Sequence, residues 1–192
     1  EAHVNLGVAY DKSGKYKEAI ESYKQALMIN PDYAIAHYNL GHAYGELGMY
    51  QEAIESSKQA IRIDPDYVKA HCNLGHAYGE LGMYQEAIES NKQAIRIDPD
   101  YVKAHCNLGN VYGKLGKHQE AIKSFKQAIR IDPDFVLAHS NLGFAYYNTG
   151  KFQEAIESYK QAIRINPDDA DAHSGLGLTY DKLSKNEEAI KS

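Results

Sequence analysis

Asparagine recurs along this chain at a constant interval, as Asn5, Asn39, Asn73, Asn107 and Asn141. A side-chain amide offers both a hydrogen-bond donor and an acceptor. A row of amides, each on its own structural element, can therefore pair with the N–H and C=O groups of an extended polypeptide whatever its side chains are. The spacing predicts recognition of a main chain, and the alternative is that asparagine in this position helps to order the protein's own packing.

Histidine and cysteine recur at the same interval, but the spacing does not favour a metal site or a disulfide. His42 and His76 stand at equivalent positions of the repeat, and so do Cys72 and Cys106. Equivalent positions on neighbouring packed helices are separated by about 8–10 Å. This distance is wide for one shared metal ion, and it exceeds the roughly 7 Å at which two Cα atoms can still be joined by a disulfide. We expect no metal ion, no cofactor and two free thiols.

Known catalytic motifs do not occur in the sequence. It contains no Gly-rich phosphate loop, no HExxH pattern and no CxxC pair. No nucleophile, base and orienting group stand at positions that a repeated structure would bring together. We expect that this chain is not an enzyme and that the active site of any enzyme it belongs to lies outside these residues.

The elements that position the asparagines follow from a repeat of the same length. Every proline in the chain keeps this interval: Pro31, Pro65, Pro99, Pro133 and Pro167. A Leu-Gly-x-x-Tyr pattern keeps the same register, beginning at Leu6, Leu40, Leu74, Leu108, Leu142 and Leu176. The sequence predicts one solenoid over residues 1–192, made of copies at 1–33, 34–67, 68–101, 102–135 and 136–169 and a partial sixth copy at 170–192.

Each copy is predicted to be a hairpin of two helices. In the second copy, Ala36, Leu40, Tyr44 and Leu47 share one helical face, and Gly48 supplies the positive φ that ends the first helix. A second helix then spans residues 51–63, with a cation in its last turn, and a proline prevents its continuation. We expect Asp66 to cap the next first helix. Since one hairpin has no core of its own, the copies must stack, which predicts an all-α solenoid.

The repeated unit resembles the tetratricopeptide repeat, in its length, its Leu-Gly-x-x-Tyr pattern, its later Ala-x-x-x-aromatic step (Ala19/Tyr23, Ala121/Phe125, Ala155/Tyr159) and its final proline. The resemblance covers the whole chain and implies a right-handed superhelix with a concave groove. Two features depart from the family pattern. Histidine replaces the opening tryptophan, at His3, His37, His71, His105, His139 and His173, where we expect a structural role. The aromatic slot becomes Ser57 in the second copy and Asn91 in the third.

By this resemblance, one stripe of each first helix faces the groove. Besides the asparagines, the candidate peptide-binding residues on this stripe are Tyr38, His42, His76, Asn110, Lys69, Lys103, Phe144 and Tyr147. Phe144 and Tyr147 are expected to form a shallow apolar pocket beside Leu137. Gly45, Gly79 and Gly113 lie mid-helix on the stripe, either as clearance for a partner backbone or as copies of an indifferent glycine. The asparagine row also resembles the ladder in the tetratricopeptide arm of O-linked N-acetylglucosamine transferases, which holds acceptor polypeptides.

The expected partner is therefore a polypeptide. Co-chaperones of this family hold acidic C-terminal tails with a lysine just before the ladder asparagine, and here that position holds Val4, Tyr38, Cys72, Cys106, Ser140 or Ser174. Lys69 and Lys103 keep a weaker attraction for acidic peptides open. A net charge of −5 with interleaved charges disfavours nucleic acid, and no long apolar run favours a membrane. The low cysteine content fits a reducing, cytoplasmic setting.

Two other roles remain open. The chain begins with Glu1 and ends at Ser192 inside a sixth copy, within its expected second helix, so we expect a segment of a longer protein. An uncovered apolar seam at this end would allow end-to-end self-association, either as native scaffolding or as a result of the cut. Alternatively, the segment is the substrate-recruiting arm of a larger enzyme such as a glycosyltransferase.

Overall fold

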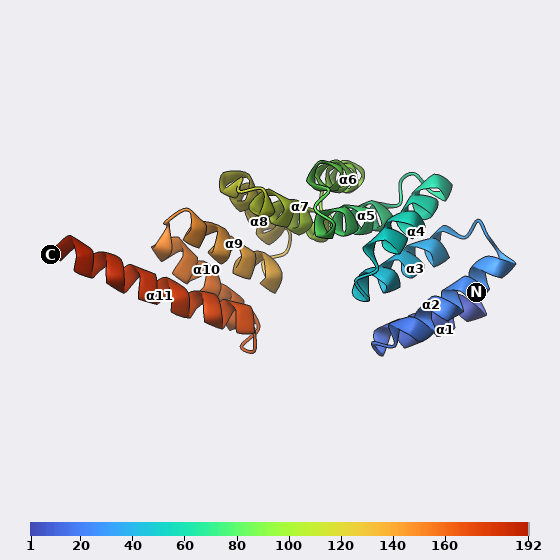
Figure 1. The fold of residues 1–192 in the computed structure, drawn as a ribbon, viewed down its shortest axis with the longest axis horizontal. Helices are drawn as coiled ribbons and strands as arrows, with labels where there is room; N and C mark the ends of the chain where they lie inside the picture. Colours follow the sequence, from blue (N-terminus) through green and yellow to red (C-terminus); the bar gives the residue numbers. More distant parts are fainter. Residues whose placement is uncertain (192) are drawn as a thin grey trace. The chain divides into compact units, whose positions relative to one another are not determined.

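A computed structural model describes the backbone of residues 1–191 and the side chains of residues 1–184. The described residues form helices and no strands (Figure 1). The helices are α1 (Ala2–Lys12), α2 (Tyr16–Ile29), α3 (Ala34–Glu46), α4 (Tyr50–Ile63), α5 (Val68–Glu80), α6 (Tyr84–Ile97), α7 (Val102–Lys114), α8 (His118–Ile131), α9 (Val136–Asn148), α10 (Phe152–Ile165) and α11 (Ala170–Lys191). The fold class is the all-α solenoid that the repeat predicts.

The turn inside each hairpin depends on a glycine. Gly48 has φ +72°, and the equivalent Gly14, Gly82, Gly116 and Gly150 have φ between +69° and +75°. Around Gly48, the N–H of Met49 donates to the carbonyl of Tyr44 at 2.9 Å. This hydrogen bond satisfies a carbonyl that the end of α3 would otherwise leave open. The predicted stop signal therefore works as expected in five successive hairpins.

The start of the following helix differs from expectation. The N-cap position of α5 is Tyr67, and no side chain caps its first amides. Asp66 does not serve as the cap. Instead, its own N–H donates to the Asp64 carboxylate at 3.2 Å, and the same bond recurs from Asp100 to Asp98 and from Asp134 to Asp132. These aspartates fix the turn between repeats rather than the end of the helix.

The chain forms two compact units, which we describe separately. Unit 1 runs from Glu1 to Ala104, and unit 2 begins at His105, within α7. In unit 1, Tyr23 and Leu40 join α1, α2 and α3 in one apolar cluster, and Ile54 packs with Leu74 to join α4 to α5. In unit 2, one cluster includes residues of α7 to α11, among them Phe125, Leu142, Tyr146 and Tyr159. Each hairpin is thus completed by its neighbour.

The two helices of a hairpin approach closely at the glycine of the Leu-Gly-x-x-Tyr pattern. A Cβ atom at Gly109 would overlap the Phe125 ring, and one at Gly75 would overlap the Asn91 amide. Asn91 and the equivalent Ser57 are fully buried, although Ser57 Oγ and Asn91 Oδ1 have no hydrogen-bond partner. The polar residues in the aromatic slot are therefore packed into the hairpin interior.

The sixth copy does not form a hairpin. The expected second helix is replaced by a continuation of α11, which is a single helix from Ala170 to Lys191 (Figure 1). The sequence explains why the helix continues, because Ser184 occupies the position at which the five earlier copies have the positive-φ glycine. Without that residue the helix has no stop signal. The side chains of residues 185–192, which complete the predicted sixth copy, lie outside the described residues.

Candidate functional site

The asparagines of unit 1 lie on first helices that touch one another. Asn5, Asn39 and Asn73 occupy the same position on α1, α3 and α5, and α3 contacts both α1 and α5. Asn39 and Asn73 are half-buried and Asn5 is exposed. Within the described residues, neither Asn39 nor Asn73 forms a side-chain hydrogen bond, and Asn73 Nδ2 is buried without a partner. These amides retain hydrogen-bonding capacity that the fold does not use.

The asparagines of unit 2 are arranged differently. Asn141 Nδ2 on α9 donates to Asn110 Oδ1 on α7 at 2.9 Å and lies 3.9 Å from Cys106 Sγ. Two of the predicted groove residues are therefore bonded to each other. Asn107 is half-buried and has interactions of its own. In this unit the amide of Asn141 orders the stacking of the first helices, as the alternative interpretation of the sequence holds.

The position just before each asparagine is used for packing. The Tyr38 ring lies against Tyr67, with ring centroids 5.1 Å apart. Burial raises the pKa of Tyr38, and it raises that of Tyr67 to about 12. The Ser140 hydroxyl donates to Asp169 at 2.7 Å. The resemblance places this position on the groove stripe, but Cys72 is only 3% exposed and therefore belongs to the interior.

Charged side chains surround the predicted groove histidines. His42 Nδ1 lies 3.4 Å from Asp11 on α1, and His42 Nε2 lies 3.8 Å from Glu46. The charge of Glu46 also raises the pKa of Tyr16. His76 Nε2 lies 3.9 Å from Glu80. The predicted lysines, Lys69 and Lys103, are exposed. This part of unit 1 presents both charge signs.

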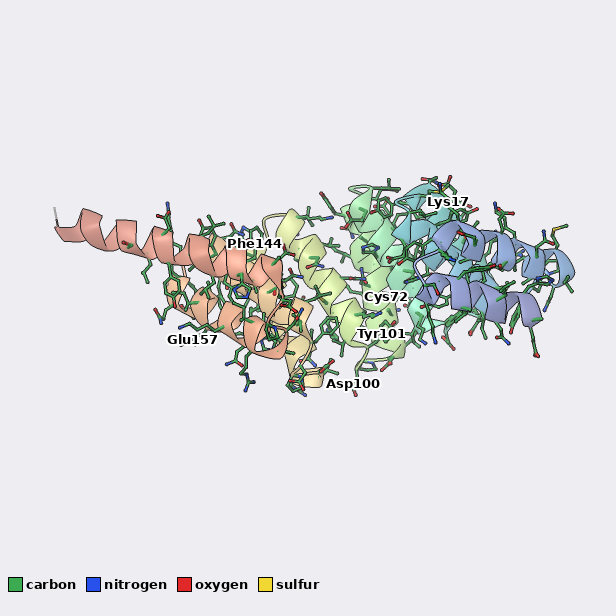
Figure 2. All side chains as sticks on the ribbon, turned by 90° about the horizontal axis from the view of Figure 1, so that it is seen from below. Lys17, Cys72, Asp100, Tyr101, Phe144 and Glu157 are labelled. Atoms are coloured by element: carbon green, nitrogen blue, oxygen red, sulfur yellow. The ribbon has the colours of Figure 1, made fainter. Side chains whose placement is uncertain are left out.

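Unit 2 carries a more apolar surface, formed by Leu137, Phe144 and Leu178, which we call the apolar stripe. Leu137 and Phe144 on α9 are 58% and 59% exposed, and Leu178 on α11 is 61% exposed. Figure 2 shows Phe144 beside α11. Tyr147 instead packs against the core, with its ring edge-on to Phe152 at 5.8 Å. Sequence reasoning missed Leu178, although it stands one repeat after Phe144.

The histidines in place of tryptophan have a structural role. The Nε2 atoms of His37, His71, His139 and His173 lie 2.8–2.9 Å from the carbonyl oxygens of Pro31, Pro65, Pro133 and Pro167. Because a carbonyl can only accept, each imidazole must carry its proton on Nε2. The ring ties its first helix to the preceding turn.

Two of the three glycines on the stripe are not required by packing. A Cβ atom at Gly45 or Gly113 would meet nothing within 4 Å. Both cysteines are buried and neither forms a disulfide, as expected. Burial raises the pKa of Cys106 to about 11, although the hydrogen bond from Asn141 opposes the shift. A thiol with so high a pKa is a poor nucleophile at neutral pH.

Two open clefts lie between first and second helices. One, of about 430 Å³ in unit 2, is lined by residues that include Leu142, Tyr146 and Glu154. The other, of about 400 Å³ in unit 1, is lined by the equivalent Leu40, Tyr44 and Glu52. A lysine covers the tyrosine ring in each cleft, with Lys126 Nζ 5.6 Å from the Tyr146 centroid and Lys24 Nζ 6.0 Å from that of Tyr44. Because equivalent residues line the two clefts, we attribute both clefts to the packing of the repeated hairpin.

The residues that the structure describes include neither a cluster suited to a metal ion nor a helix suited to span a membrane. Among these residues, His, Cys, Asp and Glu side chains do not gather in threes with a geometry that would hold a metal ion. In the same part of the chain, every helix is too short or too polar to cross a bilayer.

The chain belongs to the tetratricopeptide repeat family. The profile described as TPR repeat matches residues 7–48, 46–82, 80–116 and 146–184, and two profiles described as tetratricopeptide repeat match residues 102–135 and 124–157. No sequence among curated proteins matched the chain.

Solved structures share this fold over most of their length. MamA is 31% identical, with 86% of this chain and 96% of that chain covered and a TM-score of 0.71. A thermophilic TPR protein of Thermus thermophilus is 28% identical, with 93% and 97% covered and a TM-score of 0.81. YrrB is 24% identical, with 90% of this chain and 89% of that chain covered and a TM-score of 0.66. At this level of identity, the similarity to YrrB shows a shared fold alone.

Proposed function

We propose that this chain binds an extended polypeptide along its first helices, through hydrogen bonds between ladder asparagines and the main chain of the partner. The observation that carries the proposal is the state of Asn39 and Asn73, which lie on touching helices and make no side-chain hydrogen bond within the described residues. An unpaired buried amide costs about 1–3 kcal/mol, so a partner carbonyl reached by rotation of the Asn73 amide would recover free energy.

The spacing of the helices supports this interpretation. Helices packed about 8–10 Å apart present one amide for roughly every third residue of an extended chain, and in a polyproline II chain, which rises about 3.1 Å per residue, every third residue lies on the same side. Among the neighbours in fold, YrrB is described as having an unusual peptide-binding site. The same binding would also serve a larger enzyme as a substrate-recruiting arm.

The test is to replace Asn39 and Asn73 together by alanine and to measure binding of a fluorescein-labelled, reduced and carboxymethylated polypeptide. The matched control is Asn148→Ala, which removes an exposed amide whose hydrogen bond, among the described residues, is to its own helix at Phe144 O. We expect at least tenfold weaker binding by the double variant and no change in the control. Equal affinities of a folded double variant and the wild type would refute the role of the ladder.

Self-association is the second candidate. Leu6 is 47% exposed, whereas the equivalent Leu40 is 7% exposed beneath the preceding hairpin. On α11, a Cβ atom at Gly177 would meet nothing within 4 Å, although every equivalent glycine touches a second helix. Light scattering over a concentration series, with and without a polar capping helix added after the chain, tests this candidate. Association that the cap abolishes would support stacking through the face of α11 around Gly177. A monomer at all concentrations would exclude self-association.

A further inference from the structure

The apolar stripe of unit 2 is not explained by the packing of the fold. At the position of Phe144, the second and third copies carry His42 and His76, and the fourth carries Asn110. The helices form equally well with these polar residues, so an exposed phenylalanine and an exposed leucine are not needed for folding. Contiguous exposed apolar side chains are characteristic of binding surfaces.

The spacing of α9 and α11 limits which ligands can contact Phe144 and Leu178 at the same time. The two first helices contact each other, and Phe144 and Leu178 occupy the same position in successive copies. Their attachment points are therefore about 8–10 Å apart. In a polyproline II conformation, residues three apart lie on the same side of the chain and about 9 Å apart. In a β-strand, residues three apart point to opposite sides.

Charge at the start of α11 gives a further requirement. Asp168 and Asp171 are exposed, Asp171 follows Leu137 by one repeat, and neither carboxylate forms an ion pair among the described residues. Asp169, between them, accepts from Ser140. The nearest lysine or arginine on this helix is Lys182, towards the other end. The rim beside Leu137 therefore favours a basic partner residue.

We infer that the apolar stripe binds a peptide in polyproline II conformation, with bulky apolar side chains three residues apart and a flanking lysine or arginine. The inference rests on the proposed function and defines the partner at this part of the molecule. One apolar side chain packs on Phe144, the next packs on Leu178, and the flanking cation pairs with Asp171.

The probe is a fluorescein-labelled peptide of serine and proline that carries two leucines three residues apart and a lysine at each end. Companion peptides place the leucines two or four residues apart, or replace the lysines by glutamates. We expect the three-residue spacing to bind at least fivefold more tightly than the others, with the preference for lysine over glutamate lost in high salt. Equal affinities for all leucine spacings would overturn the inference.

The protein variant is the double substitution Phe144→Asn and Leu178→Asn, which introduces the residue that Asn110 already supplies at this position. Its matched control, Leu81→Asn, removes an exposed leucine at the turn after α5. We expect a tenfold loss for the double variant and none for the control. If the double variant binds normally while the Asn39 and Asn73 variant does not, the inference fails and the proposed function stands. If no peptide binds the wild type, both fail.

Discussion

The side-chain amide of Asn141 and the carbonyl oxygen of the Asn110 side chain are joined by a hydrogen bond of 2.9 Å between α9 and α7. A ladder asparagine can therefore stabilise the solenoid as well as contact a ligand. For Asn73 on α5, the position equivalent to Asn110 is His42 on α3. His42 is paired with Asp11 and Glu46. The residue at this position of the preceding copy therefore differs between Asn141, which is used internally, and Asn73, which is not.

This hydrogen bond should appear as a coupling energy. We expect Asn141→Ala and Asn110→Ala each to destabilise the protein, and the double variant to lose about 0.5–1.5 kcal/mol less than their sum. Urea unfolding of the four proteins measures the coupling. Strictly additive losses would mean that the two amides contribute independently.

The bond from His71 to Pro65 should contribute to stability in the same way. His71→Phe keeps a ring on the first helix but removes the Nε2 donor, so we expect a loss of roughly 0.5–1 kcal/mol in the free energy of unfolding. His76→Phe, on the same helix and without a carbonyl partner among the described residues, is the control and should change little. A loss of equal size in both variants would point to the ring itself rather than its hydrogen bond.

Much of the fold was predictable because its signals are local. Gly48 and Pro65 end helices by backbone geometry alone, wherever the rest of the molecule lies. The contacts of the site depend on pairs of residues in different copies, such as Tyr38 with Tyr67 or Asn141 with Asn110. The periodicity shows that such positions face each other but not which pairs bond. The unbroken α11 was readable from Ser184, a residue that counting whole copies overlooked.

The buried Asn91 predicts an unusual stabilising substitution. In unit 2, Phe125 fills the aromatic slot against Gly109, and in unit 1 Asn91 lies in the same relation to Gly75 with its Oδ1 unpaired. Asn91→Phe removes a buried polar atom without a partner and adds apolar burial, so we expect a gain of about 1–2 kcal/mol.

Thermal or urea unfolding measures the gain. The reciprocal substitution, Phe125→Asn, is its matched comparison and should lose roughly 2–4 kcal/mol, because it leaves a cavity and buries an amide. Destabilisation by Asn91→Phe would show that the hairpin of α5 and α6 has closed around the smaller side chain and has no room for the ring.

The Cys106 thiol makes stability depend on pH. Its pKa is raised by burial to about 11 in the folded protein, above the ordinary value of 9.0, so folding favours the neutral thiol. The stabilisation is fully present below about pH 9 and is lost as the pH rises from 9 to 11. We expect the free energy of unfolding to fall by roughly 1 kcal/mol between pH 7.5 and 10 because of this group.

Urea unfolding of the wild type and of Cys106→Ala at several pH values measures this contribution. The variant should show a shallower fall, with the remaining slope at high pH due to tyrosines such as Tyr67 and Tyr159, whose pKa values are also raised, to about 12. Parallel curves for the two proteins would mean that Cys106 has the same pKa in the folded and unfolded chains.

The most direct test of main-chain recognition is the affinity of the wild-type protein for four labelled peptides of one sequence that differ only in their backbone. One has amide bonds throughout, and each of the other three carries an ester bond in place of every third amide, in a different register. The ester removes the N–H donor and weakens the carbonyl acceptor, and it leaves the side chains unchanged. Recognition by ladder amides predicts that ester substitution weakens binding at least tenfold in one of the three registers. Equal affinity for all four peptides would contradict it.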